Sequence, residues 1–134
     1  MNLKDCHNFS DFRKLAKKKL PSPIFYYIDG GADDESTLRR NTESFNDCDL
    51  VPNILASVGK PDLSTTVFGK KIDMPIFLSP TAMQRLYLYA LAAGGQAGVE
   101  RAIEKYKAEL VRDMKLMGCT KISDLNRDNL RFRK

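Results

Sequence analysis

Apolar residues recur every three or four positions along the first part of the chain. Residues 8–20 follow this spacing, which predicts an amphipathic helix with Ser10 as its N-cap and a proline as its stop. A second short helix is expected over residues 22–29, because Pro23 suits the first helical turn and the glycine pair that follows adopts positive φ at low cost. Acidic residues at the amino end and an apolar face predict a third helix over residues 33–45.

The pattern changes to a two-residue alternation after residue 62. Residues 64–68 and 71–74 alternate around Gly69-Lys70, which predicts a β-hairpin. Residues 74–78 are almost continuously apolar, which is typical of a strand covered on both faces in a parallel sheet. Such a strand needs parallel neighbours, and the sequence offers no second candidate for one. The pattern therefore predicts a sheet that is incomplete.

From residue 88 onward the pattern is helical again. One apolar stripe ends at Gly118 and consists of Val99, Ala102, Ile103, Tyr106, Leu110, Met114 and Met117. Gly94-Gly95 predicts a helix start or a kink, because the spacing fits neither the dinucleotide fingerprint nor the P-loop. Ser123 is the expected N-cap of a last short helix through Leu130, followed by a frayed basic tail. A stripe of this kind packs in a core, and where its core is absent it favours self-association.

Length and composition indicate one small globular α+β domain. The chain has 134 residues, of which 43% are hydrophobic and 29% charged. Neither a membrane-spanning apolar stretch nor a signal-peptide pattern is present, so a cytoplasmic location is expected. The three cysteines are far apart in sequence, which predicts reduced thiols and neither disulfides nor a zinc or other metal site.

The net charge of +5 comes mainly from basic residues at the two ends of the chain. No aromatic residues alternate with these lysines and arginines in a way that would stack bases, so a nucleic-acid partner is not expected. A solvated helix face is the favoured interpretation of the basic run at residues 13–19. The alternative is weak peripheral contact with the anionic inner face of a membrane, which a single basic patch rarely sustains alone.

Several motifs resemble the FMN-dependent 2-hydroxy acid dehydrogenases and oxidases, the family of L-lactate dehydrogenase and glycolate oxidase type. In chain order they are YIDGGADDE at residues 27–35, TLRRN at 37–41, MPI at 74–76 and SPTAMQ at 79–84. Residues 88–98 and 114–120 are similar to the final helices of the same family. The resemblance divides the chain into residues 1–87, with the amino-terminal helices, the hairpin and the first barrel strand, and residues 88–134, with the carboxyl-terminal helices.

The resemblance implies a (β/α)8 TIM barrel, which takes about 250 residues with a minimum near 200. A chain of 134 residues does not close such a barrel. The expected fold is therefore an incomplete remnant of the barrel, mostly helical, with a β-hairpin and one barrel-type strand. The two parts join near residues 85–90, where a Leu-Tyr pair is repeated and where we expect an internal truncation.

The resemblance also implies a flavoprotein oxidoreductase that uses FMN to oxidise a small L-2-hydroxy acid, such as lactate, to the 2-oxo acid. By position, Tyr27 would bind the substrate carboxylate, and the backbone of Pro80, Thr81 and Ala82 would contact FMN. Without the resemblance, Tyr27 would be interpreted as a core or interface tyrosine.

The resemblance implies a catalytic His, an Arg that binds the substrate carboxylate and a Lys beside the flavin. We expect these three in the missing middle of the barrel, so no catalytic residue is assigned here. His7, the single histidine, matches no motif and is interpreted as a surface residue. The chain is therefore expected to be inactive by itself. The alternative is a helical interaction module that pairs with itself or with a full-length paralogue.

Overall fold

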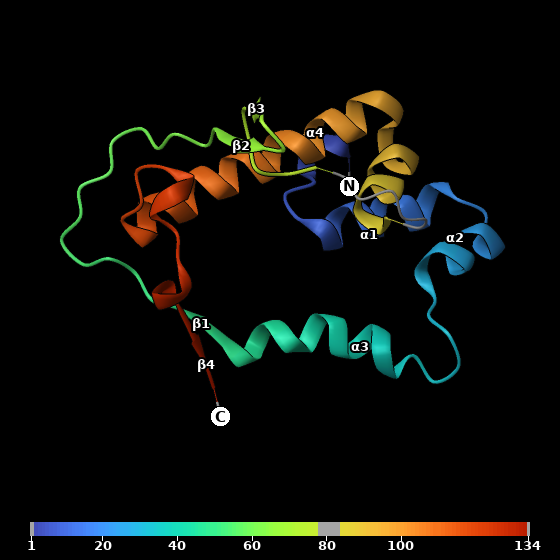
Figure 1. Cartoon of the computed structure of the whole chain (residues 1–134). Helices are drawn as coiled ribbons and strands as arrows, with labels where there is room; N and C mark the ends of the chain where they lie inside the picture. The colour runs from blue at the N-terminus through green and yellow to red at the C-terminus, as the bar shows by residue number, and fades with distance from the viewer. Residues whose placement is uncertain (1, 78–83, 134) are drawn as a thin grey trace. The chain divides into compact units, whose positions relative to one another are not determined.

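The computed structural model describes residues 2–77 and 84–133, which fall into two compact units (Figure 1). The first unit comprises the described residues of Met1–Ala32 and Leu78–Lys107, and the second those of Asp33–Phe77 and Ala108–Lys134. Both units therefore combine residues from the first and the last part of the chain. The described residues are mostly helical with short antiparallel strand pairs, and they form no closed barrel.

The first unit opens with a short 3-10 helix, η1 (Leu3–Asp5), and helix α1 (Phe9–Lys19). The helix predicted for α1 is confirmed, but Ser10 as its N-cap is wrong. Asn8 is extended and its side-chain oxygen accepts a hydrogen bond from the Asp11 amide at 3.1 Å, so the cap lies two residues earlier. The buried face of α1 consists of Phe12, Leu15 and Ala16.

Helix α2 (Ser22–Asp29) confirms the second predicted helix. It ends at Gly30, but the expected positive φ is wrong, because Gly30 is extended with a φ of −75°. The carbonyls at this end are satisfied by an arginine side chain, as described below. Phe25 is the buried residue of α2.

Helix α4 (Arg85–Met117) has a break at Gly94 and Gly95, which confirms the kink predicted there. Gly95 has φ 59° and ψ −141°, a conformation that side-chain-bearing residues rarely adopt. Just before the break, the Lys19 ammonium donates a hydrogen bond to the Ala93 carbonyl. Three helices thus contribute to the core of the first unit, which consists of Cys6, Phe12, Leu15, Ala16, Phe25, Tyr89, Ala90, Ala93 and Ala102.

The second unit begins with helix α3 (Ser36–Glu43), a 3-10 turn η2 (Ser44–Asp47) and strand β1 (Cys48–Leu50). The helix is shorter at both ends than the prediction over residues 33–45. At its start, Asp33 and Glu35 have positive φ values of 48° and 60°, which places them outside a right-handed helix.

Strands β2 (Thr65–Val67) and β3 (Lys70–Ile72) pair antiparallel and confirm the predicted hairpin. The two-residue turn lies at Phe68 and Gly69, one residue earlier than expected. Both have positive φ values, 49° and 76°, as a type I′ turn requires.

The predicted barrel-type strand is wrong for the part of it that the structure describes. Residues 74–77 form no strand, and the Phe77 side chain is 68% exposed. Leu78 lies outside the described residues. A strand of this type is stabilised by hydrogen bonds to parallel neighbours. Within the described ranges, parallel pairing is limited to a bridge between Asp62 and Lys121, so this segment has no sheet to join.

The carboxyl-terminal segment also differs from the prediction. Instead of a helix capped by Ser123, it contains two 3-10 turns, η3 (Ile122–Asp124) and η4 (Arg127–Asn129), and strand β4 (Leu130–Phe132). The Asp124 carboxylate accepts hydrogen bonds from the backbone and hydroxyl of Thr120 and from the Lys121 amide. These local bonds favour a turn over a continuing helix.

Strand β4 pairs antiparallel with β1, with Cys48 opposite Phe132 and Leu50 opposite Leu130. The Asp49 carboxylate accepts hydrogen bonds from Arg131 at 3.3 Å and from Arg133 at 2.6 Å. The expectation of a frayed basic tail is therefore wrong.

The core of the second unit is small. It consists of Leu63, Met114, Met117 and Cys119. Gly118, with a φ of 67°, ends α4 as the stripe predicted.

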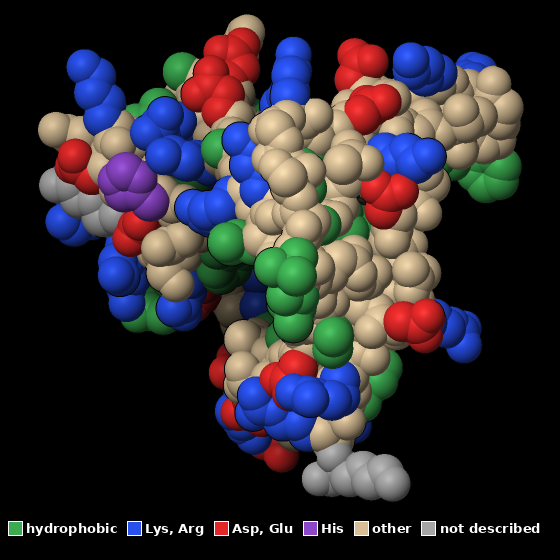
Figure 2. Space-filling view, turned by 90° about the vertical axis from the view of Figure 1, so that its left-hand side faces the viewer, with side chains coloured by type: hydrophobic (Ala, Val, Ile, Leu, Met, Phe, Trp, Pro, Cys, Tyr) green, Lys and Arg blue, Asp and Glu red, His purple; other side chains and the backbone are tan. Residues whose placement is uncertain are grey.

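Hydrophobic side chains reach the surface among lysines and arginines on the face in Figure 2. No helix in the described ranges has the length and apolar content needed to cross a bilayer.

We expect Gly98→Ala to destabilise the first unit by about 3 kcal/mol, although alanine favours helices. A Cβ on Gly98 would lie 1.9 Å from the Ala90 carbonyl oxygen, so the two parts of α4 would have to separate. Gly59→Ala is the matched control, because a Cβ there meets nothing within 4 Å. Thermal unfolding of both variants checks this, and equal melting temperatures would contradict the close approach at Gly98.

Candidate functional site

Tyr27, the predicted substrate-binding residue, lies in the last turn of α2 and is 77% exposed. A core position is therefore excluded for it. An exposed hydroxyl beside a helix end is accessible to a ligand. What fixes Tyr27 in place is the set of contacts made by the residues that follow it.

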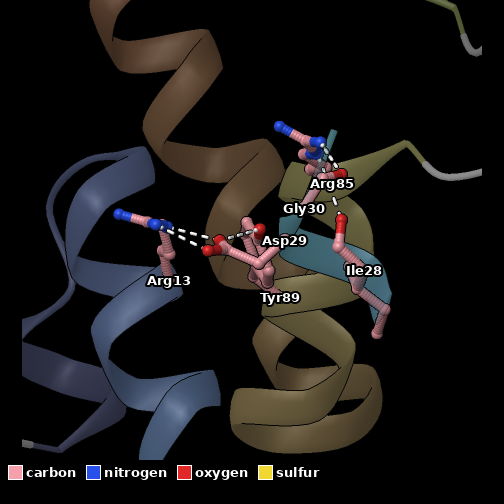
Figure 3. A network of polar contacts seen from close by, with 6 residues as sticks. All are labelled: Arg13, Ile28, Asp29, Gly30, Arg85 and Tyr89. Carbon is pink, nitrogen blue, oxygen red and sulfur yellow. Dashed lines mark hydrogen bonds and ion pairs between the residues drawn. The ribbon is translucent and has the colours of Figure 1, made fainter. Parts of the chain in front are cut away.

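Asp29, two residues after Tyr27, lies at the centre of a polar network in the first unit (Figure 3). Its carboxylate accepts hydrogen bonds from Arg13 Nε at 2.5 Å and Arg13 Nη2 at 2.6 Å, and from the Tyr89 hydroxyl at 2.6 Å. Hydrogen bonds to a charged carboxylate, and bidentate bonds from a guanidinium above all, are stronger than those between neutral groups. The network thus connects the end of α2 to α1 and to α4.

A second arginine caps the same helix end. Arg85 donates from Nε to the Ile28 carbonyl at 3.1 Å and from Nη2 to the Gly30 carbonyl at 2.7 Å (Figure 3). The last carbonyls of a helix have no partner within the helix, so a guanidinium at this place satisfies them and interacts favourably with the helix dipole. Arg85 therefore caps the end of α2, where a glycine with positive φ was expected.

Tyr89 is fully buried, and its ring packs between aromatic neighbours. It stacks with Phe25 at 6.1 Å between ring centres and meets Phe9 edge-on at 5.5 Å. Burial, followed by the hydrogen bond to Asp29 and its charge, raises the pKa of Tyr89 to about 12. The Tyr89 hydroxyl is therefore neutral at physiological pH and donates a hydrogen bond to the carboxylate.

The hydrogen bond from Arg13 is the main reason why the pKa of Asp29 lies below its ordinary value, and burial opposes this shift. The carboxylate is charged and already accepts three hydrogen bonds. It is consequently a poor proton acceptor for a substrate. The network positions the turn that carries Tyr27 and takes no proton itself.

The predicted FMN contacts, Pro80, Thr81 and Ala82, lie outside the described residues, so they stay a prediction. The residues that precede them do not fit a flavin site, because Phe77 is exposed and residues 74–77 form no strand that would present a loop to a ligand. No set of three or more His, Cys, Asp or Glu side chains within the described ranges could hold a metal ion.

His7 is exposed, and its Nδ1 lies 3.2 Å from the Lys105 ammonium. This exposure agrees with its interpretation as a surface residue.

The sequence interpretation missed Arg13, Asp29, Arg85 and Tyr89 as a set. Arg13 was assigned to a solvated helix face, although its guanidinium binds Asp29. The available signal was the acidic residue inside the motif at residues 27–35, since an aspartate beside a helix end requires a donor. Its partners come from residues far apart in sequence, and no spacing rule indicates them.

Comparison with known proteins places these motifs among flavin enzymes. A family model described as FMN-dependent dehydrogenase matches residues 16–87 and 84–132. An L-lactate dehydrogenase of Xanthobacter autotrophicus is 42% identical over 95 residues, which cover 67% of this chain and 24% of the relative. Glycolate oxidase 1 of Oryza sativa subsp. indica is 46% identical over 79 residues, 59% of this chain and 21% of the relative.

Solved structures agree. An oxidised active mutant of (S)-mandelate dehydrogenase is 32% identical with a TM-score of 0.56, covering 69% of this chain and 24% of that one. A lactate oxidase of Pediococcus acidilactici is 35% identical with a TM-score of 0.54, covering 62% and 23%. The chain spans about a quarter of the length of the relatives it matches. The two family segments meet at residues 84–87.

We expect Asp29→Asn to lower the pKa of Tyr89 from about 12, because the nearby negative charge is removed. Burial keeps the value above the ordinary tyrosine value of about 10. Ultraviolet titration of the phenolates measures it, with Tyr89→Phe identifying the Tyr89 contribution. Asp128→Asn, in the second unit, is the control and should change nothing.

The same variant tests how stability depends on pH. Because the pKa of folded Asp29 is lowered, its stabilising contribution is present above about pH 4 and is lost as the pH falls through the folded pKa. Because the pKa of Tyr89 is raised, its contribution is present below about pH 10 and is lost as the pH rises towards 12. Urea unfolding of Asp29→Asn should show a free energy of unfolding about 2 kcal/mol lower than that of the parent chain at neutral pH. The stability of the variant should also fall less steeply in acid and in alkali than that of the parent chain.

Proposed function

The chain belongs to the FMN-dependent dehydrogenase family, and we propose that it descends from an oxidoreductase that oxidised an L-2-hydroxy acid to the 2-oxo acid. The family is FMN-dependent. Support for the substrate class comes from the relatives, which are named L-lactate dehydrogenase and glycolate oxidase. The exposed Tyr27, held in place beside Asp29, is the residue that would bind the substrate carboxylate.

We propose further that these 134 residues do not carry out the reaction alone. One observation carries this proposal: the two family segments adjoin at residues 84–87 in a chain that spans about a quarter of its relatives. An internal truncation that removed the middle of a barrel explains both facts. It also explains why the apolar segment at residues 74–77 forms no strand.

The chemistry supports the same conclusion. A base that removes the substrate proton has to lie within hydrogen-bonding distance of it. The one histidine of the sequence, His7, is in contact with Lys105, and Asp29 is committed to Arg13 and Tyr89. Neither provides a free base beside Tyr27.

We expect the purified chain to retain no stoichiometric flavin and to reduce no dye when given L-lactate. The measurement is flavin absorbance after gel filtration with added FMN, followed by a dye-reduction assay with L-lactate and glycolate. A full-length glycolate oxidase prepared in the same way is the positive control. Tight FMN with substrate-dependent dye reduction would overturn the proposal.

A second candidate function is an interaction module that pairs with itself or with a full-length relative. The observation that favours it is the exposed apolar surface of the second unit, which includes Phe45, Ile54, Leu55, Phe68, Phe77, Leu116 and Phe132. Large exposed apolar side chains become association sites where they form a patch. Because the core of the same unit is small, a bound partner would add to its stability.

We expect the double variant Leu55→Asn with Phe68→Asn to weaken self-association without loss of stability. Both side chains are fully exposed, and both residues have positive φ, which asparagine adopts more readily. At Phe68 the change also places Asn-Gly in the type I′ turn, the preferred pair there.

Sedimentation velocity over a range of concentrations measures the association. Leu91→Ser, which removes an exposed leucine from the first unit, is the control. A parent chain that stays monomeric at all concentrations and ignores a full-length relative would rule out this second function.

A further inference from the structure

An apolar groove lies between the last turns of α4 and the carboxyl-terminal segment of the second unit. Its volume is about 440 Å³. Its apolar walls consist of Leu50, Leu110, Met114, Met117, Leu125 and Leu130. Sites for small molecules have volumes of about 300 to 1,000 Å³ and are lined mainly by such side chains. The two methionines at its base also adapt their shape to a flexible ligand.

Most polar side chains that line the groove already have partners. The Asn126 side chain accepts a hydrogen bond from the Asp128 amide at 2.8 Å and donates to the Asp124 carbonyl at 3.3 Å. Asn129 is buried, accepts from the Asn126 amide at 3.0 Å and donates to the Val51 carbonyl at 3.1 Å. These amides hold the wall together and are not available to a ligand.

The two charged residues of the lining differ from each other. Asp113 lies 3.9 Å from the guanidinium of Arg112, which does not line the groove. Arg127 is exposed at the groove, and its guanidinium has no ion pair with the described residues. A guanidinium binds a carboxylate through two parallel hydrogen bonds. The groove therefore combines apolar walls with one unpaired cation.

We propose that this groove binds a linear monocarboxylate, with its alkyl chain against the leucines and methionines and its carboxylate on Arg127. An alkyl chain needs no hydrogen bonds from the walls, whose amide groups are already hydrogen-bonded within the protein. A neutral alcohol of the same length gains the apolar contact and loses the charge pairing. The site lies in the second unit, while Tyr27 and its network lie in the first, so it is independent of the family reaction.

Decanoate is the probe, with binding to the full chain measured by isothermal titration calorimetry. We expect saturable one-to-one binding that is at least fivefold tighter than that of decanol. Arg127→Gln should weaken decanoate by about fivefold, the effect of one partly exposed ion pair, and leave decanol unchanged. Lys115→Gln is the matched control, because Lys115 is an exposed cation in the last turn of α4 that does not line the groove. It should not change either affinity.

A wall variant separates the groove from Arg127. Leu125→Asn changes a partly exposed side chain after η3, where folding tolerates it, and should weaken decanoate and decanol alike. Absence of saturable decanoate binding to the folded parent chain overturns the proposal. So does an equal effect of Arg127→Gln and Lys115→Gln, which would indicate non-specific charge attraction.

Discussion

The carboxylate of Asp29 is the contact on which the first unit depends. It receives Arg13 from α1 and Tyr89 from α4, while Arg85 caps the same end of α2 through two carbonyls. Asp29 belongs to the first segment that matches the family, Tyr89 lies in the second, and Arg85 lies in the overlap of the two at residues 84–87. The contacts therefore join the two segments directly across the place where they meet. The first unit is held together because residues of both segments carry complementary charges and hydrogen-bonding groups.

The second unit contains an apolar segment that forms no strand. Residues 74–77 have the apolar character of a strand covered on both faces, yet they remain irregular and Phe77 is exposed. Backbone groups in a parallel strand are satisfied by adjacent strands, so apolar character without a sheet produces no strand. The antiparallel hairpin of β2 and β3 needs only itself, and it forms. This unit therefore combines one local hairpin with a small core and the long-range pairing of β1 with β4.

The elements that could be predicted from the sequence are those whose signals are local. Helices α1 and α2 followed from their apolar spacing and from the proline and glycine that bound them, and the hairpin followed from alternation around Gly69. The pairing of β1 with β4 could not be predicted, since Cys48 and Phe132 carry no signal for each other. At the candidate site, the motif indicated Tyr27, but its exposure and the partners of Asp29 depend on tertiary contacts. Asp124, which turns the carboxyl-terminal segment, competes with the helix that Ser123 was expected to start.

The pairing of β1 with β4 has a consequence for the order in which the second unit assembles. Cys48 and Phe132 are 84 positions apart (132 minus 48), and three residue pairs hold the strands together. The entropy of closing a loop rises with the logarithm of its length, so this contact has to overcome a larger closure cost than the hairpin does. Three residue pairs at a chain end open at low free energy, as fraying termini do. We therefore expect the carboxyl terminus to dock late and to come away early, together with the wall of the apolar groove that it forms.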